Sequence, residues 1–134
     1  EEHPSNFCHV DDVKLLYKPN DNIEIIESIR ALLTRNDVDS NNIDLVISGK
    51  NGDRTNDQRY KEIEEELFSK NQIYNFKAFC GEYPTSTAFA LWLSSILLKD
   101  KISSNTISHK EINKILIYNN YQSKYHSLIL LSKC

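Results

Sequence analysis

Chemically useful side chains gather in two loops, each between an expected strand and an expected helix. The first loop is Ile47-Ser-Gly-Lys-Asn-Gly-Asp-Arg-Thr-Asn-Asp57, and it holds two of the three glycines of the chain. The second is Lys77-Ala-Phe-Cys-Gly-Glu82. Sites in open α/β sheets lie where strands end and helices begin. We therefore expect a functional site to be built from these two loops.

The common catalytic and phosphate-binding motifs are absent from the sequence. It contains no GxGxxG fingerprint, no GxxxxGK[ST] loop and no GxSxG elbow. The sequence has no CxxC motif of the kind that binds zinc. Its histidines form no HxxxH pair; they are His3, His9, His109 and His126. The sequence therefore predicts neither a metal site nor a bound cofactor.

Cysteine usage is sparse. Cys80 precedes a predicted helix, where the pKa of a thiol can be lowered, so it is a candidate nucleophile. A free cysteine is more often a small packed residue, and we favour that interpretation for Cys80. Cys8, Cys80 and Cys134 are an odd number at wide spacing and form no disulfide framework. This usage is typical of a reduced, cytoplasmic protein.

The elements that would position the two loops alternate between strand and helix. Hydrophobic periodicity and turn residues define them. In chain order they are one or two short strands within Phe7–Tyr17, a helix from Asp21 to Asn36, a strand over Ile43–Ser48, a helix over Asp57–Ser69, a strand over Ile73–Lys77, a helix over Thr85–Leu98, and strands over Ile115–Tyr118 and Leu128–Leu131. This β-α-β-α-β-α-β-β order predicts an α/β fold: a five-stranded mixed sheet with helices on both faces and an antiparallel last strand.

Two details of the first two helices can be tested. Asp21 and Glu24 have the spacing of a capping box, which would define the start of the first helix. The second helix carries four glutamates that are predicted to form a solvated face rather than a metal site: Glu62, Glu64, Glu65 and Glu66.

The helix over Thr85–Leu98 has apolar residues on every side, and its polar residues are small. A helix that is apolar all round is buried all round. The sheet can cover only one side of it, so something else should cover the far side. Leaving Phe89, Trp92 and two leucines uncovered would cost roughly 1.5–3 kcal/mol each. We therefore expect a dimer or another partner rather than a stable isolated monomer.

Composition excludes several classes of protein. The chain has 134 residues, 40% hydrophobic and 26% charged, which predicts one globular domain over 1–134. Its net charge is −3, so the chain has no excess of basic residues of the kind that nucleic-acid-binding proteins show. The longest apolar stretch, Ala88–Leu98, is too short to cross a membrane, and Glu1–His9 does not resemble a signal peptide. Because the sequence has no Met and begins at Glu, we expect a processed or excised piece.

In the order and spacing of these features, the chain from about Ile23 to Leu131 resembles the C-terminal half of a β-ketoacyl synthase, a member of the thiolase superfamily. In that half a His-Gly-Thr-Gly-Thr motif follows a strand, then come an Asp and, three residues later, a Glu. A Lys next precedes a Gly-His pair and a buried helix, and two strands joined by a Gly-Phe-Gly-Gly turn close the half. The resemblance implies that the Thr85–Leu98 helix pairs with an equivalent helix of the N-terminal half, at the centre of a five-layer α-β-α-β-α sandwich.

The first family motif is only partly kept. Asp44–Ser48 matches the strand that leads to the first histidine, but Gly49 stands in the place of that histidine. Asp57 matches the family aspartate, and Tyr60 stands where the glutamate would be.

The second motif is changed in a similar way. Lys77 matches the family lysine and Gly81 the glycine of the Gly-His pair, but Glu82 replaces the histidine. The glycine-rich turn has become Tyr121–Lys124. The family's nucleophilic cysteine belongs to the N-terminal half, so the resemblance does not give that role to Cys80.

These replacements bear on the expected mechanism. In the family, the two histidines stabilise the enolate and oxyanion that form during decarboxylation, and removing one such donor typically lowers the rate by about 10²–10³-fold. Gly49 has no side chain, and Glu82 would bring negative charge toward a developing negative charge. The resemblance therefore implies a non-catalytic subunit, similar to a chain length factor, that helps to bound the acyl cavity in fatty-acid or polyketide synthesis.

The expected partners are the N-terminal half or a ketosynthase subunit, in a heterodimer, and an acyl carrier protein. Neither nucleic acid nor a membrane is expected as a partner. Two alternatives stay open. The complete protein is an active thioesterase-like or acyltransferase-like variant that uses Lys77 and Glu82 as a charged pair, or the chain is a plain interaction module whose apolar helix forms an oligomer interface.

Overall fold

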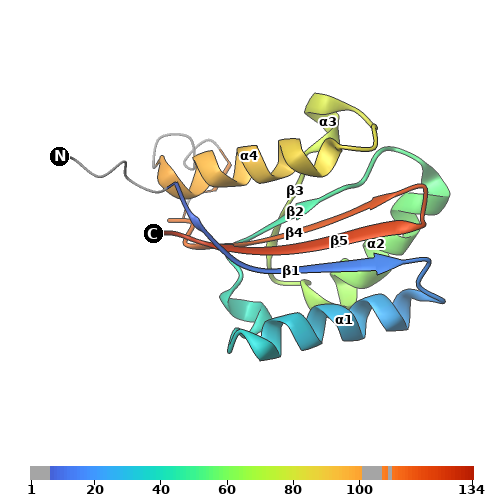
Figure 1. Ribbon diagram of the computed structural model, residues 1–134, viewed down its shortest axis with the longest axis horizontal. Coiled ribbons are helices and arrows are strands. Elements are labelled where there is room, and N and C mark those ends of the chain that lie inside the picture. The colour runs from blue at the N-terminus through green and yellow to red at the C-terminus, as the bar shows by residue number, and fades with distance from the viewer. Residues whose placement is uncertain (1–6, 101–106, 109) are drawn as a thin grey trace.

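The computed structural model describes residues 7–100, 107–108 and 110–134, so that His3, His109 and the first six residues lie outside the described part. A five-stranded sheet carries two helices on one face and one long helix on the other (Figure 1). The strands are β1 (His9–Tyr17), β2 (Leu45–Ser48), β3 (Gln72–Asn75), β4 (Lys114–Tyr121) and β5 (Tyr125–Ser132). The helices are α1 (Asn22–Arg35), α2 (Arg54–Leu67), the four-residue α3 (Lys77–Cys80) and α4 (Ser86–Lys99), with a 3₁₀ turn at Ser40–Asn42.

The strands are arranged in the order β1-β5-β4-β2-β3. β2 is parallel to both β3 and β4, whereas β5 is antiparallel to its two neighbours, β4 and β1. The mixed five-stranded sheet with an antiparallel last strand confirms the fold predicted from the element order. The apolar residues near the N-terminus form one strand, β1, at the edge of the sheet.

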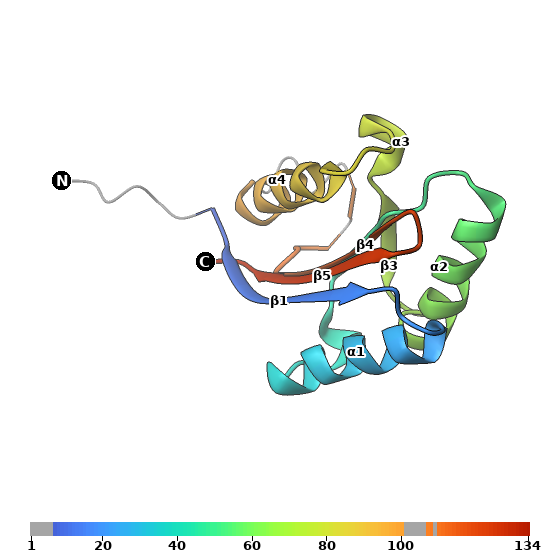
Figure 2. The ribbon, with the colours of Figure 1, turned by 45° about the vertical axis from the view of Figure 1, so that its right-hand side comes forward.

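Alternating side chains of the strands build a separate core on each face of the sheet. On one face, Ile29 of α1 and Ile63 of α2 pack with Val46 and Leu116. On the other, Ala90 and Leu97 of α4 pack with strand residues; these are Leu45, Ile47, Ile115, Ile117, Ile129 and Leu131. Figure 2 shows α1 and α2 on one side of the sheet and α4 on the other.

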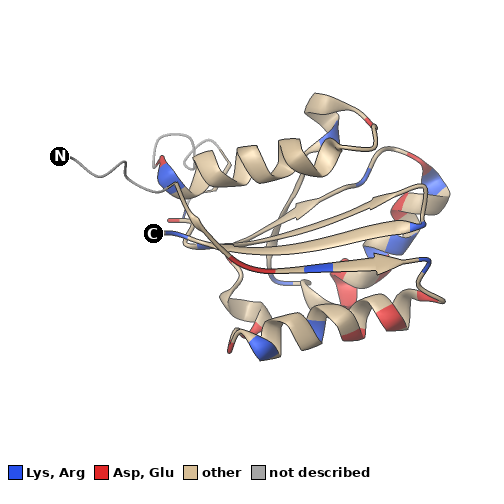
Figure 3. Ribbon diagram, in the orientation of Figure 1, with Lys and Arg blue, Asp and Glu red and all other residues tan. Residues whose placement is uncertain are grey.

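Within the described part of the chain, the sheet covers one side of the helix α4. Between Ser86 and Leu98 it has no charged residue (Figure 3). Its sheet-facing residues are buried, but Trp92 stays 56% exposed and makes a tilted ring contact with the half-buried Phe89, with 5.4 Å between ring centroids. The outer side of α4 therefore carries a partly exposed apolar stripe, with Trp92 as its most exposed large side chain.

The helix starts agree with the sequence signals in part. The Asp21 carboxylate accepts from the Glu24 backbone N–H at 2.9 Å and begins α1, and Asn36 ends that helix. The reciprocal bond of a capping box is absent, because Glu24 accepts from the Asn20 backbone N–H instead. The second helix begins at Arg54 rather than at Asp57, since Asp53 caps it.

The expectation of a solvated glutamate face is wrong for one residue. Glu62, Glu65 and Glu66 are exposed, but Glu64 is buried. It accepts from the Ser48 hydroxyl at 2.7 Å and from the Lys50 ammonium group. The position lies one turn after the buried Tyr60, on the helix face that packs against the sheet, so its charge is buried with partners.

Candidate functional site

The two loops singled out in the sequence meet at the ends of β2 and β3. The Asn51 side-chain amide of the first loop donates to Glu82 Oε2 of the second at 2.8 Å. The expected strand ends at Asn75 rather than at Lys77, so Lys77 begins the short helix α3. The two loops that hold Gly49, Asp57, Lys77, Gly81 and Glu82, the positions that the resemblance assigned to the family site, therefore contact each other.

Lys77 is a buried cation with two acceptors. Its side chain is 1% exposed, and its ammonium donates to Glu82 Oε2 at 2.7 Å and to the Asn120 carbonyl at 3.1 Å. A buried charge is tolerated only when it is paired and hydrogen-bonded. Glu82 is therefore the counterion of Lys77, and Lys77 connects the second loop to the end of β4.

Gly49 occupies a position where a side chain would clash with two neighbouring side chains as they are placed. It follows β2 directly, and its backbone N–H donates to the Tyr118 carbonyl at 3.0 Å. A Cβ atom at Gly49 would lie 2.2 Å from Asn119 Oδ1 and 2.6 Å from the Tyr60 hydroxyl oxygen. Both distances are far below van der Waals contact. Two neighbouring side chains therefore occupy the space beside Gly49, the position that the resemblance gave to the family's first histidine.

Those two neighbours are held from other elements. The Tyr60 hydroxyl accepts from the Asn120 backbone N–H at 2.7 Å, and burial, then the nearby Tyr118, raises the pKa of Tyr60 well above 10. The Asn119 side-chain amide donates to Thr87 Oγ1 of α4 at 2.8 Å. Tyr60 is thus a neutral hydroxyl, and Asn119 joins β4 to the start of α4.

Asp57 and Gly81 shape the two loops. The Asp57 carboxylate accepts from the backbone N–H groups of Asn51 and Gly52, each at 3.0 Å, and so holds the first loop closed. Gly81 has a φ of +76°, which lets the chain reverse from α3 toward Glu82. Both residues act on the backbone of their own loop in this arrangement.

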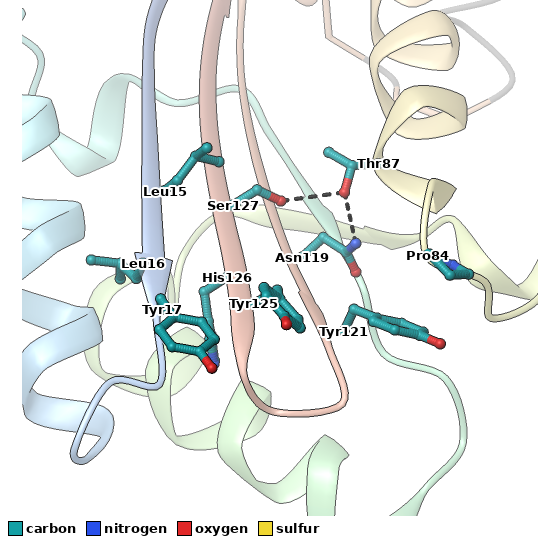
Figure 4. Close-up of a pocket in the computed structure, with 10 residues that line it drawn as sticks. All are labelled: Leu15, Leu16, Tyr17, Pro84, Thr87, Asn119, Tyr121, Tyr125, His126 and Ser127. Atoms are coloured by element: carbon teal, nitrogen blue, oxygen red, sulfur yellow. Dashed lines mark hydrogen bonds between the residues drawn. The ribbon is translucent and has the colours of Figure 1, made fainter.

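A pocket of about 400 Å³ lies beside this site, between the start of α4 and the strands β1, β4 and β5 (Figure 4). Its lining is mostly apolar and aromatic; it consists of Leu15, Leu16, Tyr17, Pro84, Thr87, Asn119, Tyr121, Tyr125, His126 and Ser127. A smaller, polar hollow of about 270 Å³ is lined by Asn51, Asp53, Asn56, Glu82, Tyr121, Gln122 and Ser123. Tyr121 borders both spaces.

Sequence reasoning missed the Asn119–Asn120 pair. These two buried asparagines end the apolar run of β4 and contact Thr87, Tyr60 and Lys77. Two adjacent amides at the end of a buried strand were the available signal, since buried polar groups need partners.

Cys80, the candidate nucleophile, is the last residue of α3. The Cys80 Sγ lies 3.4 Å from the Gly81 carbonyl and is partly buried against the core beneath α4. Within the described ranges, no three His, Cys, Asp or Glu residues are placed to hold a metal ion. Among the described residues, no helix is both long and apolar enough to span a membrane.

No protein-family model matches the sequence, and no curated protein matches it. Several solved structures match the chain, and three of them share 11–15% sequence identity with it. The ishigamide ketosynthase/chain length factor has a TM-score of 0.80 at 11% identity, over 96% of this chain and 38% of that one. The PfaC keto synthase-chain length factor has a TM-score of 0.75 at 15% identity, over 98% of this chain and 14% of that one.

The third is AntDE:AntF, a type II PKS acyl-carrier protein in complex with its ketosynthase bound to the hexaketide. It has a TM-score of 0.78 at 11% identity, over 96% of this chain and 39% of that one. This chain therefore spans well under half the length of each. The likeness confirms the resemblance at the level of the fold: nearly the whole chain has the α/β fold of a segment of these ketosynthase and chain length factor proteins.

Proposed function

We propose that this chain is the C-terminal half-domain of a non-catalytic, ketosynthase-like subunit, similar to a chain length factor, which acts in the cytoplasm with an active ketosynthase in fatty-acid or polyketide synthesis. The observation that carries the proposal is the closed position at Gly49. A Cβ there would lie 2.2 Å from Asn119 Oδ1, so a histidine at this position would clash with the Asn119 side chain where it now lies.

The chemistry of condensation explains why that position matters. Decarboxylation of a malonyl thioester places negative charge on the thioester oxygen, and catalysis needs donors aimed at that oxygen. Gly49 offers no side chain, and Glu82 offers a carboxylate. The Lys77 ammonium is buried and already donates to Glu82 and to the Asn120 carbonyl. If each lost donor lowers the rate by about 10²–10³-fold, the pair of replacements lowers it by roughly 10⁴–10⁶-fold.

The uncovered apolar surface supports a partner on the α4 side of the sheet. α4 leaves the β1 edge of that face bare, where Val13, Leu15 and Tyr17 lie beside Tyr125, each at least half exposed. Leu15, Tyr17 and Tyr125 also line the pocket, and Trp92 is exposed on α4. A second helix of an N-terminal half, lying next to α4, would cover these side chains. The greater length of the matching chains is consistent with such a half.

The experiment uses the full-length protein that contains this chain. Purified alone, it is incubated with malonyl-loaded acyl carrier protein, and carbon dioxide release and acyl transfer are measured. We expect neither reaction from the protein that has been freed of its partner. We expect product when the ketosynthase that co-purifies with the protein is added back. Native mass spectrometry identifies that partner. Acyl transfer from the carrier protein to a cysteine of the purified protein would overturn the proposal.

The Lys77–Glu82 ion pair is the one feature that favours an active acyl-transfer variant. Its burial and its bond to the Asn120 carbonyl favour a structural role instead, because salt bridges of this kind are common without catalysis. Glu82→Gln separates the two in the intact protein. Unchanged turnover would show that the ion pair is structural. A large loss of turnover in a folded variant would support an active acyl-transfer enzyme.

The exposed stripe on α4 favours a second candidate, a plain oligomerisation module. That function predicts a homodimer through α4 that binds neither acyl carrier protein nor any acyl thioester. The same native mass spectrum distinguishes it from a heterodimer with a ketosynthase.

A further inference from the structure

Two cysteines that are far apart in the sequence lie at the same corner of the sheet. β1 and β5 pair antiparallel, and the outermost pair of their ladder joins His9 to Ser132. Cys8 directly precedes His9, and Cys134 follows Ser132 by two residues. Continued in this register, the ladder places Cys8 opposite Lys133, next to Cys134. Figures 1 and 2 show the start of β1 and the end of the chain at the same end of the sheet.

The geometry of paired strands sets the separation of the two cysteines. Neighbouring strands lie about 4.8 Å apart and rise about 3.4 Å per residue, so Cα atoms offset by one residue are roughly 6 Å apart. This lies within the Cα separation of about 4.4–6.8 Å that disulfides require. Inside a regular ladder such an offset would direct the two side chains to opposite faces. Both cysteines lie beyond the last ladder pair, where the pleat no longer fixes their direction.

The two thiols differ in exposure. Cys8 is partly buried and packs against the core beneath α4, whereas Cys134 is exposed. Burial is the main cause that raises the pKa of Cys8, and the nearby Cys134 is the second. The influence of Cys134 on the pKa of Cys8 agrees with the proximity that the register gives.

We propose that Cys8 and Cys134 form a reversible disulfide that fastens the edge strand β1 to β5. Both are free thiols in the structure, so the bond is made under oxidising conditions. Strand β1 has only one neighbour in the sheet and provides Leu15 and Tyr17 to the pocket wall. The bond would fix the far end of that wall.

Glutathione disulfide is a sufficient oxidant. The thiolate of the exposed Cys134 attacks one sulfur of glutathione disulfide, which forms a mixed disulfide and releases one glutathione thiolate. The Cys8 thiolate then attacks the Cys134 sulfur and releases the second glutathione. Two protein thiols lose two electrons and two protons, and one glutathione disulfide becomes two molecules of glutathione.

The test is oxidation of the reduced full-length protein with glutathione disulfide, followed by alkylation, intact mass measurement and peptide mapping. We expect a mass lower by two hydrogens, a peptide that joins Cys8 to Cys134, and a raised midpoint of thermal unfolding. Because the pKa of Cys8 is raised, closure should accelerate between about pH 7 and 9.

Serine variants provide matched controls. Cys80→Ser should still form the bond, since Cys80 follows β3 at the opposite edge of the sheet. Cys8→Ser and Cys134→Ser should not, and the latter changes an exposed side chain, so its fold should be kept. A stable glutathione adduct on Cys134 without closure, a crosslink to Cys80, or Cys8 and Cys134 both still alkylatable after oxidation would each overturn the proposal.

Discussion

Replacement of Gly49 by alanine tests whether the closed position at the end of β2 is real. The added Cβ would lie 2.2 Å from Asn119 Oδ1 and 2.6 Å from the Tyr60 hydroxyl oxygen. Ordinary contact begins near 3.4 Å, so the Asn119 side chain must retreat by roughly 1 Å or the strand must shift.

The magnitude follows from what holds those neighbours. Retreat of Asn119 breaks its 2.8 Å bond to Thr87, and displacement of Tyr60 weakens its 2.7 Å bond from the Asn120 backbone N–H. Overpacking of a core costs about 1–3 kcal/mol, and a buried polar group left without a partner costs about 1–3 kcal/mol more. We therefore expect Gly49→Ala to lower the free energy of unfolding by about 2–6 kcal/mol.

Urea unfolding followed by circular dichroism measures the change. Gly52→Ala is the matched control, because Gly52 has a φ of +88° and nothing lies within 4 Å of its Cβ position. That variant should be destabilised only by the strain of an alanine in the left-handed backbone region, about 1–2 kcal/mol. Asn119→Ala should be less harmful in the Gly49→Ala background than alone, since it removes the clash. A Gly49→Ala protein as stable as the parent would refute the steric argument and, with it, the main support for the non-catalytic function.

Three further predictions follow from single contacts. Glu82→Ala removes the counterion of the buried Lys77 and should lower stability by about 1–3 kcal/mol in urea, whereas Glu82→Gln should lose less because its amide oxygen still accepts. Burial lowers the pKa of His126 below 6.5, so the unfolded chain binds more protons than the folded chain as the pH falls. The contribution of His126 to stability should therefore be complete above pH 6.5 and should be lost as the pH drops through the folded pKa. Thermal melts across pH should show a less steep loss in His126→Gln. Trp92 is 56% exposed, so Trp92→Ser should change the stability of the chain by less than about 1 kcal/mol yet weaken association with the partner, measured by sedimentation.

The order of elements was predictable because it rests on local patterns. Apolar residues at helical or alternating spacing define α1, α2, α4 and the strands, and the alternation of strand and helix dictates a mixed sheet. The start of α1 followed from Asp21, since a cap acts within one turn. The start of α2 was misplaced because both Asp53 and Asp57 can begin a helix, and Asp57 instead closes the preceding loop.

Contacts between different helices and strands could not be predicted from local sequence patterns. The burial of Glu64 depends on Ser48 and Lys50, which reach it only once β2 lies under α2. A solvated glutamate and a buried one look the same in sequence, because the surroundings that decide the charge come from another element.

The sequence by itself determined the fold class, the two loops that meet at the strand ends, and the need to cover the outer side of α4. Each of these depends on residue type and spacing along a short stretch of chain. Only the tertiary structure decided that Gly49 has no room for a side chain. That result depends on the register of β2 with β4, which pairs Ser48 with Tyr118 and so sets Asn119 beside Gly49. Register is a property of the assembled sheet, because the partners that fix it are distant in the sequence.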